Sequence, residues 1–310
     1  MRDKFTPPKP LNTAVLFLIF NRLDVTKQVF QAIRQAKPPR LYLAADGARK
    51  NTEGEAEKVI AVREYALQNI DWDCEVKTLF RDKNLGCKYA VSGAIDWFFE
   101  QEEMGIILED DCLPSQSFFW FCEELLGKYK EDKRVFLISG YNKQNIWKNI
   151  EFDYFFSSFG GIWGWASWRR AWAYYDVNMS DLDVFSSQEG FENLLGRKVG
   201  KARKSLIKSV EKKKVDTWDY QWAYTRHKNG ALACVPTSSM VENIGFGVDA
   251  THTVNTIDDG VRKNEVSIPL RDNPFFVPDR EYDRRFIVKK PVYWKLVNKL
   301  SRFLRLLHVR

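Results

Sequence analysis

Several features that mark whole classes of protein are missing from this chain. No apolar stretch reaches the roughly 20 residues of a membrane-spanning helix, and the polar, proline-rich segment 1–10 has no signal-peptide core. The five cysteines are widely spaced and form no Cys-x-x-Cys pair, which argues against both a zinc site and a disulfide framework. We therefore expect a cytoplasmic enzyme of bacterial type in a reducing compartment.

Acidic residues are absent from the last part of the chain. Residues 284–310 contain nine Lys or Arg and no Asp or Glu, whereas the other 39 of the 48 basic residues are outnumbered by 41 acidic residues. The excess positive charge is therefore a property of this end, and nothing in the body of the protein predicts nucleic-acid binding.

This basic end has the pattern of an amphipathic helix at 291–310. One helical stripe contains Leu296, Leu300, Phe303 and Leu307, and lysines and arginines flank it. The pattern is typical of a helix that lies in the plane of an anionic membrane, which predicts peripheral attachment at the inner face of the cell membrane. The alternative is a helix that docks on its own domain.

The first part of the chain alternates apolar runs with helical patterns. Continuous apolar runs are typical of strands buried on both faces. Strands are predicted at 14–20, 41–45, 74–80 and 105–108, with intervening helices near 26–37 (capped by Asp24 or Thr26), 53–68 and 90–98. This βαβαβαβ order predicts an α/β fold with a mixed, mostly parallel sheet flanked by helices.

The order of elements is less regular after residue 112. Helices are expected at 115–129, 168–174, 192–214 and 217–227, strands at 135–138, 152–159 and 231–235, an aromatic turn at 160–165, and an extended segment at 261–283. The aromatic turn is expected to lead directly into the helix that follows it.

A triplet of carboxylates, Glu109-Asp110-Asp111, follows the fourth predicted strand. Such a cluster costs repulsion energy unless a cation lies beside it, and oxygen ligands of this kind suit Mg²⁺ or Mn²⁺. The carboxyl end of a strand in an open α/β sheet is also where nucleotide ligands bind. The alternative is an acidic loop before a helix, which Pro114 and Ser115 indicate.

The order of several short motifs resembles a known family. The motifs are Asn21-Arg22, Ala45-Asp46, Glu109-Asp110-Asp111, the glycine–tryptophan turn at 161–165, Thr217-Trp218-Asp219, and the loop 243–247 with His252. Together they resemble the GT-A nucleotide-sugar transferases, in particular the N-acetylglucosaminyltransferase I group and bacterial HlpA-like transferases, over residues 13–255.

The resemblance implies a GT-A fold and a division of the chain. A glycosyltransferase domain is expected at 13–260, with a nucleotide half at about 13–112 and an acceptor half at about 113–260. A polar tail, 1–12, would precede it, and a C-terminal extension, 261–310, would follow.

The resemblance also implies roles in the donor site. The last acid of the family's triplet is the metal ligand, here Asp111, while Glu109 and Asp110 would lie near the donor sugar and ribose. Asp46 corresponds to the residue that reads uracil, although an ordinary Asp-Gly turn also explains it. Arg22 is expected near the nucleotide, with a surface salt bridge as the alternative.

A second group of residues is expected on the donor side. Arg81, Asn84 and Lys88 follow the third predicted strand, where phosphate or ribose contacts are expected and a helix cap and a solvated lysine are the alternative. His252 resembles the histidine of a loop that closes over the donor. The alternative is an exposed loop histidine.

Transfer with inversion needs a base that takes the proton of the acceptor hydroxyl. Asp219, which follows a tryptophan, matches the family's base, and Asp216 is the runner-up because Tyr220 replaces the family's second acid. The alternative is an aspartate that caps a helix. Trp163 and Trp165 are expected to form a sugar platform, with core packing as the alternative.

The sequence therefore predicts a metal-dependent, inverting hexosyl- or N-acetylhexosaminyltransferase with Mn²⁺ or Mg²⁺ as cofactor. It would move a sugar from a UDP-sugar to a glycan or lipid-linked glycan in bacterial surface polysaccharide synthesis. One alternative is a nucleotidyltransferase on the same sheet, although the Gly-rich, basic loop of such enzymes is missing after the first strand. Another is an inactive membrane-associated protein that binds sugar nucleotides.

Overall fold

The computed structural model describes residues 5–148, 151–246 and 260–287. Its first half alternates strands and helices: β1 (Val15–Ile19), α1 (Leu23–Ala36), β2 (Arg40–Ala45), α2 (Glu55–Gln68), β3 (Glu75–Phe80), α3 (Gly86–Gln101) and β4 (Met104–Glu109). All four strands of this half run parallel to one another. The predicted βαβαβαβ order is confirmed.

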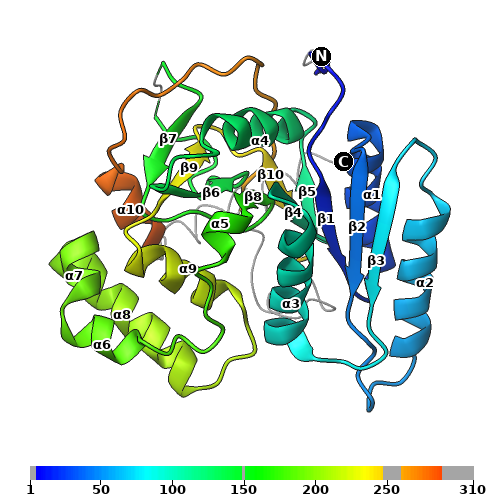
Figure 1. Ribbon diagram of the computed structural model, residues 1–310, viewed down its shortest axis with the longest axis horizontal. Coiled ribbons are helices and arrows are strands. Elements are labelled where there is room, and N and C mark those ends of the chain that lie inside the picture. The colour runs from blue at the N-terminus through cyan, green and yellow to red at the C-terminus, as the bar shows by residue number, and fades with distance from the viewer. Residues whose placement is uncertain (1–4, 149–150, 247–259, 288–310) are drawn as a thin grey trace, which may run out of the picture.

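Both faces of the first strand are buried, as its continuous apolar run predicted. Val15 and Phe17 pack in the core under α1 and α4, whereas Leu16 and Leu18 pack against Phe98 and its neighbours on α3. Alternate side chains of a strand point to opposite faces of the sheet, so one run serves two cores. Helices accordingly flank the sheet on both sides (Figure 1).

The second half completes the sheet and adds helices beside it. Its elements are β5 (Cys112–Pro114), α4 (Ser117–Lys128), β6 (Val135–Ser139), β7 (Tyr154–Ser157), β8 (Trp165–Trp168), α5 (Arg169–Trp172), α6 (Leu182–Ser187), α7 (Gly190–Leu195), α8 (Arg197–Lys212), α9 (Asp219–Lys228), β9 (Leu232–Pro236), β10 (Val241–Asn243) and α10 (Arg280–Ile287). Helices α6, α7 and α8 form a group beside the sheet, on the side away from β3 (Figure 1).

The large sheet has the strand order β3-β2-β1-β4-β8-β6-β9-β7, and only β8 and β7 run against the others. The predicted class, an α/β fold with a mixed, mostly parallel sheet flanked by helices, is confirmed. A second, two-stranded sheet pairs β10 with β5, and Asn243 lies opposite Cys112. That small sheet brings the loop after β10 to the acidic triplet.

Three local predictions are wrong. The aromatic turn does not lead directly into a helix, because Trp165–Trp168 forms the buried strand β8 between β4 and β6. The helix predicted at 192–214 is interrupted at Gly196, whose φ of +80° ends α7 before α8 begins. Helix α1 begins without a side-chain cap, since the Thr26 hydroxyl donates to the Arg22 carbonyl inside the first turn.

The segment after residue 260 packs on the body of the protein. The Glu265 carboxylate accepts hydrogen bonds from the backbone N–H groups of Gln116 and Ser117, and Arg271 forms an ion pair with Asp153. Helix α10 follows and buries Tyr282. His252 and the predicted membrane helix 291–310 lie outside the described residues, so those predictions and the domain boundaries remain predictions.

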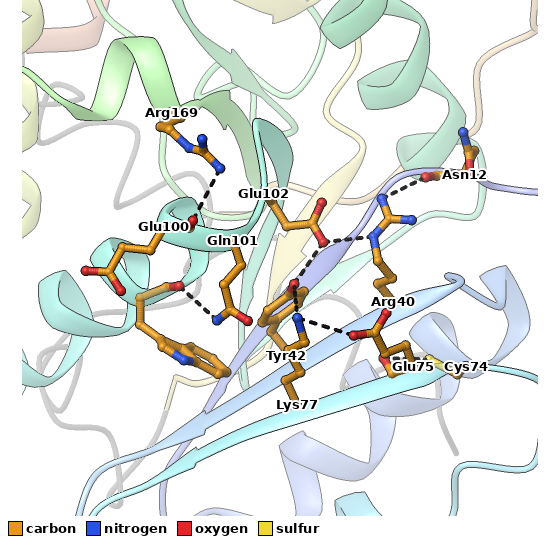
Figure 2. Close-up of polar contacts among 11 residues, drawn as sticks. Asn12, Arg40, Tyr42, Cys74, Glu75, Lys77, Glu100, Gln101, Glu102 and Arg169 are labelled. Atoms are coloured by element: carbon orange, nitrogen blue, oxygen red, sulfur yellow. Dashed lines mark hydrogen bonds and ion pairs between the residues drawn. The ribbon is translucent and has the colours of Figure 1, made fainter.

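The opposite edge of the parallel strands is held by ordinary polar pairs. Figure 2 shows the Glu102 carboxylate between the Tyr42 hydroxyl and the Arg40 guanidinium, each 2.8 Å from Oε1. Lys77 of β3 reaches the same tyrosine hydroxyl at 3.4 Å. These contacts tie the end of α3 to β2 and β3.

Among the helices that the structure describes, none has the length and apolar character needed to cross a bilayer.

Candidate donor and acceptor site

A cavity of about 660 Å³ opens at the carboxyl ends of β1, β2 and β4, where it also contacts the loop before α9. The register of the parallel strands explains its position, because Ile19 pairs with Ala45 and Leu18 pairs with Glu109. The three strands therefore end side by side. Polar residues that follow them meet at one edge of the sheet, which is the position that binds ligands in open α/β folds.

Most of the residues predicted for the site line this cavity. They are Arg22, Asp46, Arg81, Asn84, Glu109, Asp110, Asp111, Trp163, Asp216 and Asp219. Lys88 and Trp165 are not part of the lining. Cys87 and Thr217 also line it. Cys87 belongs to no motif that the sequence shows, and Thr217 was part of the motif Thr217-Trp218-Asp219 but was given no role of its own.

Arg22 supplies the cation that the acidic triplet was predicted to need. Its guanidinium forms ion pairs with Asp110 and with Asp111, the latter at 3.0 Å between Nη2 and Oδ2. Burial raises the pKa of Asp110 to about 6, although Arg22 acts to lower it. Oδ2 of Asp110 is buried and has no hydrogen-bond partner among the described residues. The negative charge of Asp110 and Asp111 is therefore only partly neutralised by Arg22.

Glu109 is the carboxylate in the least favourable environment. Burial raises its pKa well above the usual range, and the negative charges of Asp111, Asp110 and Asp219 raise it further, while Arg22 opposes them. Asp219 belongs to α9, in the second half of the chain, and lines the same cavity. The carboxylates of the two halves thus face one another closely enough to interact.

The carboxylates of the cavity can be compared with the ligands that a divalent cation requires. Within the described ranges, no group of three or more His, Cys, Asp or Glu side chains forms a metal cage. Mg²⁺ and Mn²⁺ sites at substrate phosphates commonly use one or two carboxylates and complete the shell with water and phosphate oxygens. Asp111 in the cavity wall and the unpaired Oδ2 of Asp110 fit that second kind of site and not the first.

Asp46 and Asp216 both bind the backbone at the start of α3. The Asp46 carboxylate accepts hydrogen bonds from the N–H groups of Gly47, Leu85 and Gly86 at 2.9–3.1 Å. Asp216 accepts from the N–H groups of the next two residues of the helix, at 2.8 and 2.9 Å. The four-residue start of α3 is therefore capped from both halves of the fold.

Asp219 has a different set of contacts from Asp216. It is the first residue of α9, and its Oδ1 accepts a hydrogen bond from the Thr217 hydroxyl. Its side chain is partly exposed and lines the cavity. Its Oδ2 has no protein donor among the hydrogen bonds of the described residues. Of the two predicted bases, only Asp219 has a carboxylate oxygen with no protein donor among the described residues.

The remaining donor-side residues contribute mainly to the backbone. The Asn84 amide donates to the Gly47 carbonyl at 2.7 Å, and the Arg81 guanidinium donates to the Ala90 carbonyl at 3.2 Å. Lys88 caps through its backbone N–H, and its ammonium lies 5.3 Å from the centre of the Tyr89 ring. These contacts agree with the alternative of an ordinary cap for this group.

The two predicted platform tryptophans lie in different environments. Trp163 is partly exposed, lines the cavity and meets Tyr141 and Phe246 edge-on. Trp165 is 0% exposed, and its ring stacks on Trp218 with 5.7 Å between centroids. Neighbouring rings cover Trp165, so it belongs to the core, and of the two only Trp163 presents a surface to the cavity.

Gly245 packs closely against Asp111 and Arg22. A Cβ atom at this position would lie 2.2 Å from Oδ2 of Asp111 and 2.7 Å from Nη1 of Arg22. The pairing of β10 with β5 brings the loop here, and the backbone N–H of Ile244 donates to the Asp111 carbonyl at 2.9 Å. Only glycine allows this approach.

Comparisons with known proteins leave the family open. The sequence matches no protein-family model and no curated protein. Among solved structures, HddC from Yersinia pseudotuberculosis is similar with a TM-score of 0.28 and 10% identity over 41% of this chain and 57% of that one. HddC complexed with GMP-PN has a TM-score of 0.32 and 10% identity, and the match covers 51% of this chain and 77% of that one. The glycosyltransferase GlyE in Streptococcus pneumoniae TIGR4 has a TM-score of 0.31 and 12% identity, and the match covers 57% of this chain and 39% of that one. Likenesses this loose support no functional argument.

Proposed function

We propose that the protein is a glycosyltransferase that moves a sugar from a UDP-sugar to a glycan or lipid-linked glycan. The observation that supports this most directly is the meeting of Glu109, Asp110 and Asp111 with Asp219 across one cavity. The first three follow a strand of the nucleotide half, and the fourth begins a helix of the acceptor half. A donor and an acceptor can therefore be held between them.

Asp219 is the proposed base of a single, inverting displacement. Thr217 holds Oδ1, so Oδ2 is the oxygen that takes the proton of the acceptor hydroxyl. The acceptor oxygen then forms its bond to the anomeric carbon as the bond from that carbon to the diphosphate breaks. The leaving diphosphate keeps the electron pair, and Arg22, which lies beside Asp111 in the cavity wall, is the cationic side chain proposed to stabilise that charge.

Asp111 is the proposed ligand of a divalent cation, with Mn²⁺ or Mg²⁺ as candidates. When bound, the ion would neutralise charge on the leaving diphosphate. The Arg22 ion pair occupies Oδ2 of Asp111, so a cation that uses this oxygen would displace Arg22 from it and leave the ion pair with Asp110. The possible metal ligands described above, the carboxylate of Asp111 in the cavity wall and the unpaired Oδ2 of Asp110, support this assignment.

Asp46 is proposed to orient the nucleobase. A carboxylate offers about four acceptor positions, and three backbone N–H groups, with that of Leu85 shared between both oxygens, use most of them. One position remains for the imide N–H of uracil. Because its other bonds fix the loop at the start of α3, Asp46 would present that position with little freedom to move.

A thermal-shift screen tests the proposal. UDP-, GDP-, dTDP- and CMP-sugars are added with and without Mn²⁺, and binding to the folded state raises the melting temperature. We expect the largest shift with a UDP-sugar and Mn²⁺, and we expect Asp111→Ala to lose the Mn²⁺-dependent part. Asp111→Ala that keeps both UDP–Mn²⁺ affinity and transfer would overturn the assignment. Binding without transfer or hydrolysis of the donor would identify an inactive binding protein.

The predicted membrane contact of 291–310 is a separate proposal that rests on the sequence pattern. Deletion of these residues is expected to release the protein from liposomes that contain anionic lipid. Matched neutral liposomes are the control. Unchanged binding to the anionic liposomes would refute the membrane role.

A further inference from the structure

A buried basic cluster lies beside the acceptor half of the cavity. It consists of Arg203 on α8 and Arg226 and His227 on α9, with exposed fractions of 8%, 2% and 1%. Charged residues are almost never buried to this degree unless they are paired. The cluster therefore needs a physical reason, and the proposed donor site does not use it.

The cluster has several hydrogen-bond donors without acceptors. Nε of Arg203 donates to Nε2 of His227 at 3.1 Å, so the neutral ring carries its proton on Nδ1. That Nδ1 has no partner, and neither do Nε and Nη1 of Arg226. The only bond of the Arg226 guanidinium in the described chain is a long one, 3.4 Å from Nη2 to the Gly160 carbonyl.

No carboxylate of the described residues lies close enough to form an ion pair with either guanidinium. Among the ion pairs of the described residues, none includes Arg203 or Arg226, and the two arginines repel each other. Burial, and then the charge of Arg203, lower the pKa of Arg226 to about 9. Aromatic rings give partial compensation only, since Phe159 and Tyr220 each lie 5.7 Å from the Arg203 guanidinium.

The position of the cluster relates it to the acceptor. Tyr220 lines the cavity on one side and contacts Arg203 on the other. The negative charge of Asp219, the proposed base, acts on Arg203. The cluster thus lies directly behind the residues at which the acceptor is expected to bind, and away from the strand ends that face the donor.

We propose that Arg203, Arg226 and His227 form a binding site for an oxyanion, and that the oxyanion is a phosphate group of the acceptor. An anion here would accept the orphaned N–H groups and neutralise two buried charges, and charge-assisted bonds of this kind are the strong ones. Assignment of the phosphate to the acceptor rests on the proposed glycosyltransferase function. The anion site itself does not depend on it.

Replacement of a buried, uncompensated charge gives a sharp test. Such a charge destabilises the protein when no anion is bound, so its removal should raise stability. Removal of a paired buried charge lowers stability instead, because its partner is left uncompensated. Arg226→Met is therefore expected to raise the melting temperature in phosphate-free buffer. It is also expected to abolish the increase, about 2 °C or more, that inorganic phosphate causes in the wild-type protein at constant ionic strength. Arg203→Met is the second variant and should act in the same direction.

Arg170→Met is the matched control. Its guanidinium is half-buried, less than those of the cluster. All three of its nitrogens donate to backbone carbonyls, those of Lys130, Val135 and Tyr129. This variant should melt at a lower temperature and keep the phosphate response. If Arg226→Met and Arg203→Met also lower the melting temperature, or if phosphate does not stabilise the wild-type protein, the cluster is structural and the proposal is wrong.

A competition experiment separates acceptor phosphate from donor diphosphate. Phosphate and UDP with Mn²⁺ are added singly and together, and additive shifts are expected because the two ligands occupy different sites. Mutual exclusion would overturn the acceptor assignment. Failure of sugar transfer alone would refute the proposed function and leave the phosphate response, since that response needs no donor.

Discussion

The carboxylate of Asp216 accepts a hydrogen bond of 2.9 Å from the backbone N–H of Cys87, in the other half of the fold. The next N–H, of Lys88, binds the same carboxylate. Gly86, at φ +78°, makes this approach possible, because a Cβ there would lie 2.7 Å from Oδ2 of Asp216. Asp216 therefore caps α3 and joins the two halves, three residues before Asp219, whose Oδ2 has no protein donor among the described residues.

Because Asp216 caps a helix and Asp219 does not, substitutions at the two predicted bases should have different effects. Asp216→Ala should lower the free energy of unfolding by about 1 kcal/mol, the usual loss for a helix cap, and leave substantial transfer activity. Asp219→Asn should reduce kcat by roughly 10²–10⁴-fold, because proton transfer to the base is lost, with little change in stability. Chemical denaturation and initial rates measure the two effects. The reverse pattern, with transfer lost only in Asp216→Ala, would make Asp216 the base.

Arg22 should be a major stabiliser of the acidic triplet. Its ion pairs with Asp110 and Asp111 are formed by side chains that are 17%, 7% and 14% exposed. Removal of one partner from a buried pair leaves an uncompensated charge, so Arg22→Met should cost about 3–5 kcal/mol. Asp110→Asn in that background should recover part of the loss, as measured by chemical denaturation.

The same variant tests the divalent site without an activity assay. With Arg22→Met, Mn²⁺ should raise the melting temperature by more than it does in the wild-type protein, because the ion no longer competes with a guanidinium for Asp111. Asp111→Asn combined with Arg22→Met is the control and should lose the response. Equal responses of the variant and the wild-type protein would mean that Mn²⁺ binds elsewhere.

The parallel half of the fold could be predicted because its strands are buried on both faces. Runs such as 14–20 are then continuously apolar, and their carboxyl ends must meet at one edge. The position of the acidic triplet at the same edge of the sheet as Asp46 follows from that rule. Its partner Arg22 was expected near the nucleotide, yet its ion pairs with the triplet could not be inferred from spacing alone.

Other parts of the site depend on contacts between distant segments. Trp165 begins a four-residue strand that is inserted antiparallel between β4 and β6, and a run this short has no periodicity of its own. The cap that Asp216 provides comes from 128 residues away along the chain, so no local motif marks it. Arg203 lies on a helix rich in exposed lysines, and in sequence it resembles them.

Trp163 and Trp165 should respond differently to substitution by alanine. Trp165 is fully buried among Trp172, Trp218 and Trp222, so Trp165→Ala should cost about 3–5 kcal/mol of stability. Trp163→Ala should change stability much less and should raise the KM for the acceptor. Thermal melting and acceptor titrations measure the two effects. A large loss of stability in Trp163→Ala, with unchanged KM, would remove Trp163 from the platform.

His227 should give the stability a specific dependence on pH. Burial, and then the charges of Arg203 and Arg226, hold its pKa well below the usual range, so the folded protein keeps the ring neutral. The unfolded chain binds a proton below about pH 6.5, so stability is lost as the pH falls below that value. The slope from this residue is at most about 1.4 kcal/mol per pH unit. His227→Gln, whose side-chain carbonyl can still accept from Arg203, should flatten denaturation free energies between pH 6.5 and 5, and should leave them nearly unchanged at pH 8. An unaltered slope would show that the ring is not held neutral by its two arginine neighbours.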